Sequence, residues 1–167
     1  GRRVLFRGGA AGTYLTVPTG GEGLEGGRVV EAGGGEGHNR AVLDSGEVYS
    51  WGSGLHGCVG HGDMREMGGV QTDGAGEPYL TVPTRVEALK GQRAVHACCG
   101  GADNLAVVDG GKACCWGSGR HGCWGHGDMS ESAGVQTDGA GEPCLAARTR
   151  LEPLQAHPAR CGGGRAA

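Results

Sequence analysis

The sequence predicts an all-β protein built from repeated units of four short antiparallel strands, the kind of unit that forms the blade of a β-propeller. Three observations support this prediction. The chain repeats itself at a constant offset, short apolar segments recur at that offset, and glycine is very abundant, with 39 glycines among 167 residues. No segment keeps helical periodicity for more than two turns. Many short strands joined by glycine turns explain these observations together.

The repeat is the strongest of these signals. Trp51–Asp63 has the sequence WGSGLHGCVGHGD and Trp116–Asp128 has WGSGRHGCWGHGD, at an offset of 65 residues. At the same offset, Val70–Pro78 is identical to Val135–Pro143. We therefore expect the tail of one unit, two complete units and the start of another, at 1–30, 31–95, 96–160 and 161–167.

The first complete unit is expected to form four strands in chain order. Arg28–Ala32 is predicted as the first strand and ends in a glycine cluster, and Arg40–Leu43 is a short apolar second strand. Asp44–Glu47 supplies a hairpin turn, in which glycine can take the positive φ that other residues avoid. Val48–Trp51 is the predicted third strand, and Thr84–Leu89 is the fourth, after a long glycine-rich connection.

The second unit is expected to repeat this order at equivalent positions. Its predicted strands and its turn are Arg93–Ala97, Leu105–Val108, Asp109–Lys112, Ala113–Trp116 and Thr149–Leu154.

Each unit also carries a nearly identical insert before its last strand, at 64–78 and at 129–143. Recent duplication explains the identity of these inserts. The alternative is a shared role, in which the inserts project as matching loops from one rim of the propeller and contact partners. The residues of these candidate partner loops are Met64, Gln71, Asp73, Met129, Gln136 and Asp138.

The units resemble the repeat of the regulator of chromosome condensation family. The shared pattern is a glycine pair, a histidine, an apolar strand, Asp-x-Gly, and then a glycine-rich string from Trp51 to Asp63. The spacing between His38 and Trp51 is also the family's. The repeat signature consists of His38, Trp51, Gly52, Gly57, Gly60, Gly62, Asp63, Trp116, Gly117, Gly122, Gly125, Gly127 and Asp128.

This resemblance implies an incomplete propeller of about two and a half blades, part of what is commonly a seven-bladed structure. It also implies that Trp51 and Trp116 pack between blades, and we expect His38 to hydrogen-bond within its own blade. The second unit departs from the pattern, because Asp103 stands in the place of His38. The inserts explain why the repeat is longer than the family's period of about 50 residues.

A cluster of potential metal ligands recurs in both units. It consists of His56, Cys58, His61 and Asp63, and of His121, Cys123, His126 and Asp128. Zinc binds such side chains, but their spacing is not that of paired zinc ligands. Asp63 and Asp128 are better explained as residues that bond the backbone of an Asx turn. We therefore favour structural turns, with a metal site as the alternative.

The cysteines do not form a convincing catalytic site. A nucleophilic thiolate needs an electropositive environment and an orienting partner, and a site that recurs in consecutive units is atypical of an enzyme. Cys98 and Cys99 are adjacent on a predicted strand, so their side chains point to opposite faces. This arrangement suits apolar packing in a reducing, intracellular compartment better than a disulfide framework.

We therefore expect a non-catalytic scaffold for protein–protein interaction, without a cofactor, in a larger intracellular assembly of the cytoplasm or cytoskeleton, a cilium included. Its expected partners are proteins. The net charge of −3 and a pI near 6.2 do not indicate a nucleic-acid-binding face, and no apolar run is long enough to cross a bilayer. One alternative is an exchange factor for a small GTPase or a chromatin-binding regulator in the nucleus. Another is a propeller attached to a ubiquitin ligase.

Overall fold

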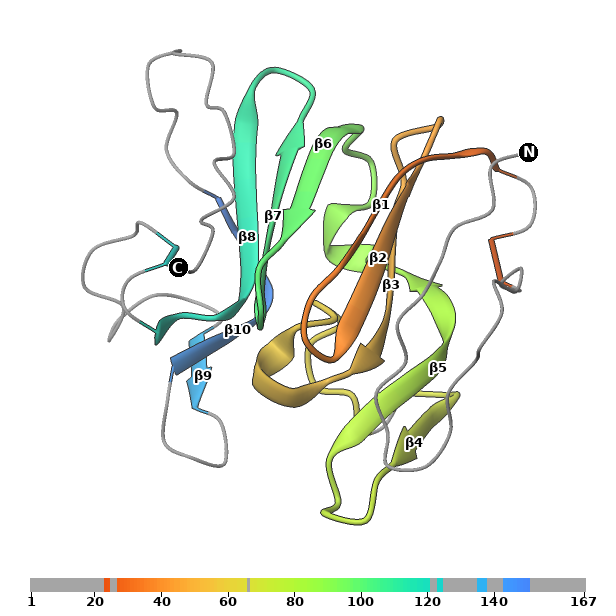
Figure 1. Cartoon of the computed structure of the whole chain (residues 1–167). Helices are drawn as coiled ribbons and strands as arrows, with labels where there is room; N and C mark the ends of the chain where they lie inside the picture. The colour runs from red at the N-terminus through yellow and green to blue at the C-terminus, as the bar shows by residue number, and fades with distance from the viewer. Residues whose placement is uncertain are drawn as a thin grey trace, which may run out of the picture.

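The protein folds into two five-stranded antiparallel sheets, each built from one continuous stretch of chain (Figure 1). The computed structural model describes residues 23–24, 27–65, 67–120 and 123–124, and the backbone of 135–137 and 143–150. The strand order is β1-β2-β3-β5-β4 in the first sheet and β6-β7-β8-β10-β9 in the second. Both sheets thus have one topology, which confirms the predicted all-β, repeated architecture.

The sheets begin two residues before the predicted units at 31–95 and 96–160. The first sheet contains β1 (Val29–Gly34), β2 (His38–Leu43), β3 (Val48–Ser53), β4 (Val70–Thr72) and β5 (Pro78–Arg85). The second contains β6 (Ala94–Cys99), β7 (Asp103–Val108), β8 (Lys112–Ser118), β9 (Val135–Thr137) and β10 (Pro143–Arg150). Two single-turn 3₁₀ helices follow strands of the first sheet, η1 (Leu55–Gly57) and η2 (Glu87–Leu89). The predicted segment at 161–167 and most of the one at 1–30 lie outside the described residues.

The predicted hairpin turns join β2 to β3 and β7 to β8. In the first turn, the backbone N–H of Gly46 donates to the carbonyl of Leu43 at 2.8 Å, and that of Leu43 donates to Glu47 at 2.9 Å. Gly46 has a φ of 85°, which a residue with a Cβ rarely adopts. In the second turn, Gly111 donates to Val108 at 3.0 Å. Both turns thus form where they were predicted, and the first is also bonded from outside, because the backbone N–H of Ala94 donates to the Gly46 carbonyl at 2.9 Å.

The inserts are not simple loops. Val70–Thr72 forms the edge strand β4, whose Gln71 lies opposite Tyr79 of β5. The equivalent strand β9 gives each sheet a fifth strand, where four were predicted. The prediction missed it because a strand of three residues has too few alternating positions to leave a pattern in the sequence.

The fourth predicted strand was placed too late in the chain. It runs over Pro78–Arg85, and the end of the predicted strand instead forms η2, Glu87–Leu89, which Val86 precedes. Val86 and Leu89 are both buried. Residues three apart lie on one side of a 3₁₀ turn, whereas in a strand they would point to opposite faces. Burial of both side chains in one place therefore favours the turn. The equivalent residues 151–154 lie outside the described residues.

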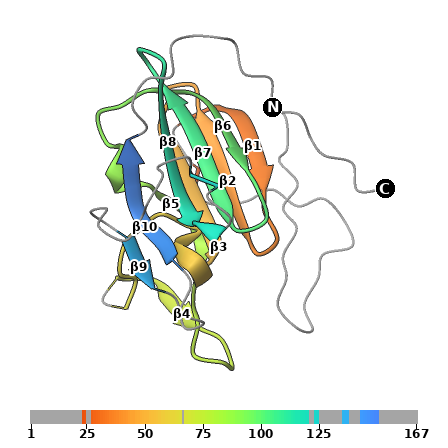
Figure 2. The ribbon, with the colours of Figure 1, turned by 90° about the vertical axis from the view of Figure 1, so that its left-hand side faces the viewer.

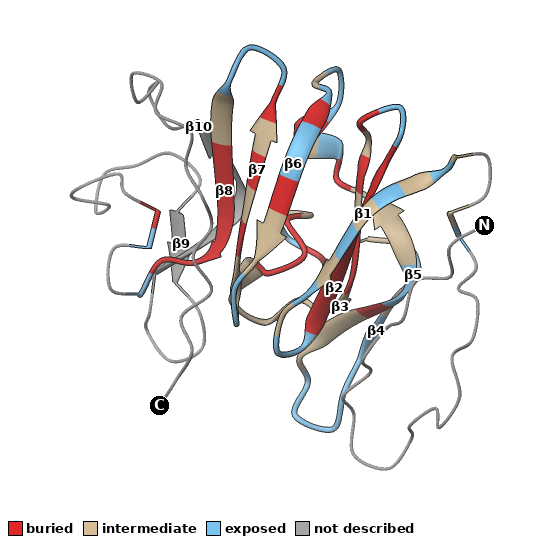
Figure 3. Cartoon of the chain, turned by 45° about the horizontal axis from the view of Figure 1, so that its top comes forward, coloured by how far each residue is buried: buried red, intermediate tan, exposed pale blue. Residues whose placement is uncertain are grey.

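The main core lies between the two sheets, which pack with their faces together (Figures 1 and 2). Figure 3 shows that β2 and β8 carry buried residues along most of their length. The largest cluster combines residues of both sheets with Val86 and Leu89 of the connection. Its members are Val42, Val48, Val86, Leu89, Ala94, Ala97, Ala106, Cys114, Cys115, Trp116 and Trp124. The face between the sheets is therefore a core shared by two propeller blades.

None of the described residues forms a helix that is both long and apolar enough to span a membrane.

Candidate interaction site

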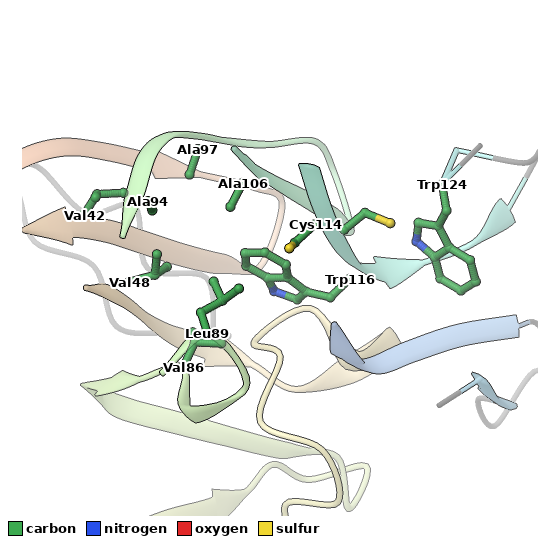
Figure 4. Packing of buried hydrophobic residues seen from close by; sticks show 11 residues of the cluster. Val42, Val48, Val86, Leu89, Ala94, Ala97, Ala106, Cys114, Trp116 and Trp124 are labelled. Carbon is green, nitrogen blue, oxygen red and sulfur yellow. The ribbon is translucent and has the colours of Figure 1, made fainter. Parts of the chain in front are cut away.

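The junction between the two blades is centred on Trp116. Its side chain is 1% exposed and lies between the sheets beside Leu89 (Figure 4). The indole Nε1–H donates to the carbonyl of Cys58 at 3.1 Å, and this carbonyl belongs to the glycine-rich string of the first blade. The predicted packing of Trp116 between blades is confirmed. Trp51, at the equivalent position, packs in a second cluster made of residues of the first unit.

His38 bonds across the junction and not within its own blade, so that prediction was wrong. Its Nε2 lies 3.0 Å from Oδ1 of Asn104, a residue of β7 in the second blade. The Asn104 amide donates from Nδ2 to the Cys58 carbonyl at 2.8 Å, and the Cys99 thiol donates to its Oδ1 at 3.2 Å. One asparagine therefore links three segments. Burial lowers the pKa of His38, although its bond with Asn104 acts in the opposite direction.

An ion pair between a buried arginine and a half-buried glutamate also lies at the junction. Arg40 is 2% exposed, lies 3.7 Å from a carboxylate oxygen of Glu31, and donates from Nη2 to the Ala97 carbonyl of the second blade. The other Glu31 oxygen accepts the backbone N–H of Ala97 at 3.0 Å. The second unit has Leu105 and His96 at the positions of Arg40 and Glu31. Sequence comparison missed this pair, although a charged residue within a predicted apolar strand was a usable signal.

The insert hairpin of the first blade exposes its polar side chains. Gln71 and Asp73 are exposed; the Tyr79 hydroxyl donates to Oε1 of Gln71 at 2.8 Å. The Asp73 carboxylate accepts the backbone N–H groups of Ala75 and Glu77 at 2.8 Å and 3.0 Å, so it stabilises the turn. These two candidate partner residues are therefore held in place at the surface.

The second blade repeats the backbone of this hairpin. Gln136 lies opposite Cys144, as Gln71 lies opposite Tyr79, so the two hairpins have the same register. Both lie at the end of the sheets away from the β2–β3 and β7–β8 turns (Figure 1). Met64 does not belong to this surface, because its side chain is 4% exposed and packs in the core of the first unit. Met129 and Asp138 lie outside the described residues, and only the backbone of Gln136 is described.

The repeat itself identifies the family. The model of the regulator of chromosome condensation (RCC1) repeat matches residues 45–107, from the first hairpin turn into β7 of the second blade. The chain belongs to the RCC1 repeat family. It is 32% identical over 116 residues to the mitochondrial RCC1 domain-containing protein RUG3 of Arabidopsis thaliana, covering 70% of this chain and 23% of that protein.

Two further comparisons agree with the RCC1 assignment. The E3 ubiquitin-protein ligase HERC2 of Homo sapiens is 33% identical over 108 residues, which cover 64% of this chain and 2% of the ligase. The crystal structure of Prp20p from Saccharomyces cerevisiae matches 77% of this chain and 26% of its own with a TM-score of 0.63 and 20% identity, a likeness of fold. The chain thus spans about a quarter or less of these relatives.

The RCC1 signature residues of the first unit have structural contacts. The backbone N–H of Arg65 donates to the Asp63 carboxylate at 3.1 Å, which confirms the predicted Asx turn. His61 lies 3.0 Å from the Ser50 hydroxyl, and the Cys58 thiol donates to the carbonyl of Ala102 at 3.2 Å. These side chains bond different partners, and no three metal-binding side chains converge in the described part of the chain. The copies Gly122, Gly125, Gly127 and Asp128, with His121 and His126, lie outside it.

The remaining signature glycines lie where the backbone turns or packs closely. Gly52 and Gly117 lie within β3 and β8, and Gly57 ends η1. Gly60 approaches Trp116 so closely that an added Cβ would lie 2.8 Å from the indole ring.

Two described thiols are poor candidates for a nucleophile. Burial raises the pKa of Cys115 to about 11 and also raises the pKa of Cys99. A catalytic thiol needs the opposite shift, because the thiolate is the reactive form. Cys115 packs in the core of the junction, whereas Cys99 is half-buried and donates to Asn104.

Proposed function

We propose that this chain is a non-catalytic protein-interaction module of a larger intracellular assembly, and that its insert hairpins contact the partner. The observation that carries this proposal is the duplicated hairpin, identical in sequence from Val70 to Pro78 and from Val135 to Pro143. Both copies have the same strand register, and the described copy exposes Gln71, Thr72 and Asp73. Two equal surfaces on a rigid support allow one partner to bind twice, which raises its avidity.

The relatives have diverse roles, which favours interaction over a shared chemistry. One is described as mitochondrial, one is a ubiquitin ligase, and Prp20p is described by its binding to Gsp1p and histones. The role of Prp20p supports a second candidate, a regulator of a small GTPase or of chromatin. A cytoplasmic, cytoskeletal or ciliary assembly and a nuclear one both remain within the proposal.

Affinity capture with the full chain from its source cells tests the proposal. The variant Thr72→Lys/Thr137→Lys places one cation on each edge strand, where the described threonine is exposed. The matched control is Ser45→Lys in the exposed β2–β3 turn at the other end of the sheets. We expect the double variant to lose its stoichiometric partners by about tenfold or more and the control to keep them.

Equal capture by the double variant and the control would contradict a role for the hairpins. Enrichment of a small GTPase or of histones would move the regulator function to first place, and stimulated nucleotide release from that GTPase would establish it.

A further inference from the structure

The insert hairpin places an edge strand on the outside of each sheet. β4 is the last strand of the first sheet and β9 is the last strand of the second, and no described strand pairs with their outer edges (Figure 1). The unpaired edge of a sheet presents backbone N–H and C=O groups to which another extended chain can bond. Each hairpin therefore offers a template for one further strand.

The register of the hairpin shows which backbone groups of β4 point outward. Asp73 donates its backbone N–H to the carbonyl of Glu77 at 3.0 Å, so these two residues form a hydrogen-bonded pair. Hydrogen-bonded and non-hydrogen-bonded pairs alternate along an antiparallel ladder, which makes Gln71 and Tyr79 the next bonded pair. The two residues that flank Gln71 therefore point their backbone groups away from β5.

Pro78 gives independent evidence for this orientation. It lies opposite Thr72, but its carbonyl accepts the backbone N–H of Gly54 at 2.8 Å, on the side of β3. Thr72 and Pro78 thus share no hydrogen bond, and Val70 has the same orientation as Thr72 because it lies two residues earlier. The outer edge of β4 offers one N–H and one C=O group from each of Val70 and Thr72.

The outer edges lack a bulge, whereas the inner edges have one. The inner edge strands β1 and β6 shift register between Val29 and Glu31 and between Ala94 and His96, and a bulge of this kind hinders pairing with another chain. The described registers of β4 and β9 contain no shift. Both strands have the sequence Val-Gln-Thr, without the lysine or proline that often blocks an edge. Only their length of three residues limits pairing, so one hairpin by itself is a weak site.

The charge of the inserts indicates the charge of the segment that they bind. Residues 64–78 contain three acidic residues and one arginine, and residues 129–143 contain three acidic residues and no basic one. Their net charges are therefore −2 and −3, which leaves +2 for the rest of a chain whose total is −3. Asp73 and Glu77 lie at the ends of the β4–β5 turn, and neither forms an ion pair with a described residue. The hairpins thus complement a basic segment.

We propose that each insert hairpin binds a basic, extended segment of a partner protein, which adds as a further strand to the outer edge of β4 or β9. The proposal rests on the proposed function as a protein-interaction module and specifies how the hairpins recognise the partner. The backbone of the segment bonds to Val70 and Thr72, and its lysine or arginine side chains pair with Asp73 and Glu77. In this mode of recognition main-chain hydrogen bonds supply the affinity and side chains supply the specificity. Two identical hairpins compensate for the short edge through avidity.

Binding of synthetic peptides to the full chain, measured by fluorescence anisotropy, tests this proposal. The parent peptide alternates valine with lysine, and a second peptide has glutamate in place of lysine. Two further peptides are methylated at the backbone nitrogens of all valines or of all lysines, so each loses the N–H groups of one edge only. We expect the glutamate peptide and one of the two methylated peptides to bind at least about tenfold more weakly than the parent, and the other methylated peptide to bind nearly as well.

Variants of the edge strands provide the matched controls. Thr72→Pro/Thr137→Pro removes one outward N–H from each edge and takes no donor from the ladder with β5 or β10. Thr72→Val/Thr137→Val keeps this N–H and the β-branched shape. We expect the proline variant to bind the parent peptide about tenfold or more weakly and the valine variant to bind it as wild type does. The methylated peptides keep the test valid if the proline variant fails to fold.

Failure of the parent peptide to bind, equal binding of the two methylated peptides, or equal binding of the lysine and glutamate peptides would overturn the proposal. Equal binding by the valine variant and a folded proline variant would do the same. Loss of captured partners by Thr72→Lys/Thr137→Lys would in that case leave the hairpins as a contact surface and exclude only strand addition as its mode of recognition.

Discussion

At the residue scale, the junction depends on a few buried polar groups. Asn104 accepts from one side and donates to the other, so both polar ends of its amide are bonded. A buried polar group is tolerated only when its hydrogen bonds are made, so these contacts select one alignment of the blades. Arg40 is less well satisfied, because its Nε and Nη1 have no hydrogen-bond partner among the described residues.

Two histidines, the buried His38 and the half-buried His61, make the stability sensitive to acid. Burial lowers the pKa of both His38 and His61 from the ordinary value of 6.5. The unfolded chain therefore binds more protons than the folded one once the pH falls below about 6.5, and the fold loses stability there. Urea unfolding measured at several pH values between 8 and 5 should give a free energy of unfolding that is constant above about pH 7 and falls progressively below pH 6.5.

His61→Gln keeps a donor for the Ser50 hydroxyl but cannot be protonated in this range, so it should reduce the loss of stability between pH 6.5 and pH 5. An acid-induced loss of the same size in His61→Gln and His38→Gln as in wild type would show that other groups cause it.

At the element scale, the glycine-rich string from Trp51 to Asp63 continues β3 into a loop that packs against the second blade. It leaves β3, brings the Cys58 carbonyl to the second blade, and passes Trp116 at Gly60. Two of its glycines have similar backbone angles and different surroundings, since Gly60 has a φ of 71° and Gly62 a φ of 74°. Nothing lies within 4 Å of a Cβ added at Gly62.

These two glycines separate backbone strain from packing. Gly62→Ala should cost about 1–2 kcal/mol, because a left-handed conformation is unfavourable for alanine. Gly60→Ala should cost about 1–3 kcal/mol more, because the new methyl group also contacts the indole ring of Trp116. Chemical denaturation of both variants measures the difference, and equal losses of unfolding free energy would contradict close packing of Gly60 on Trp116.

At the scale of the whole molecule, the two blades share one core. Val42 and Val48 of the first sheet belong to the same cluster as Ala106 and Trp116 of the second. Each repeat buries one face against its neighbour, so this cluster exists only when both sheets are folded. The stability of the two blades is therefore coupled through the junction.

We expect the described blades to unfold in a single cooperative transition, with equal calorimetric and van't Hoff enthalpies. Trp116→Ala should lower the unfolding free energy by about 3–5 kcal/mol, because it removes the largest buried side chain at the junction. Trp116→Phe keeps much of the apolar contact and serves as the matched control. Two separate transitions in the wild-type protein would contradict the shared core.

The sequence by itself determined the repeat, the strand-turn-strand order and the family. These features depend on local patterns, such as the Asp44–Gly46 turn and the alternation of short apolar segments with glycine clusters. The Asx turn at Asp63 was also predictable, because its hydrogen bond joins residues two apart in the chain. The short strand β4 and the turn at Glu87–Leu89 were not, since their conformations depend on pairing and burial.

Only the tertiary structure decided which residues meet at the junction. Comparison at the repeat offset finds equivalent residues, such as Trp51 and Trp116, but it does not show which residues of the two blades contact each other. Some of the contacts join equivalent residues, as Glu36 donates its backbone N–H to the Gly101 carbonyl, and others join non-equivalent ones, as His38 joins Asn104 at a separation of 66 positions. The reason is that such contacts depend on how the two blades pack in space, which no local pattern in the chain specifies.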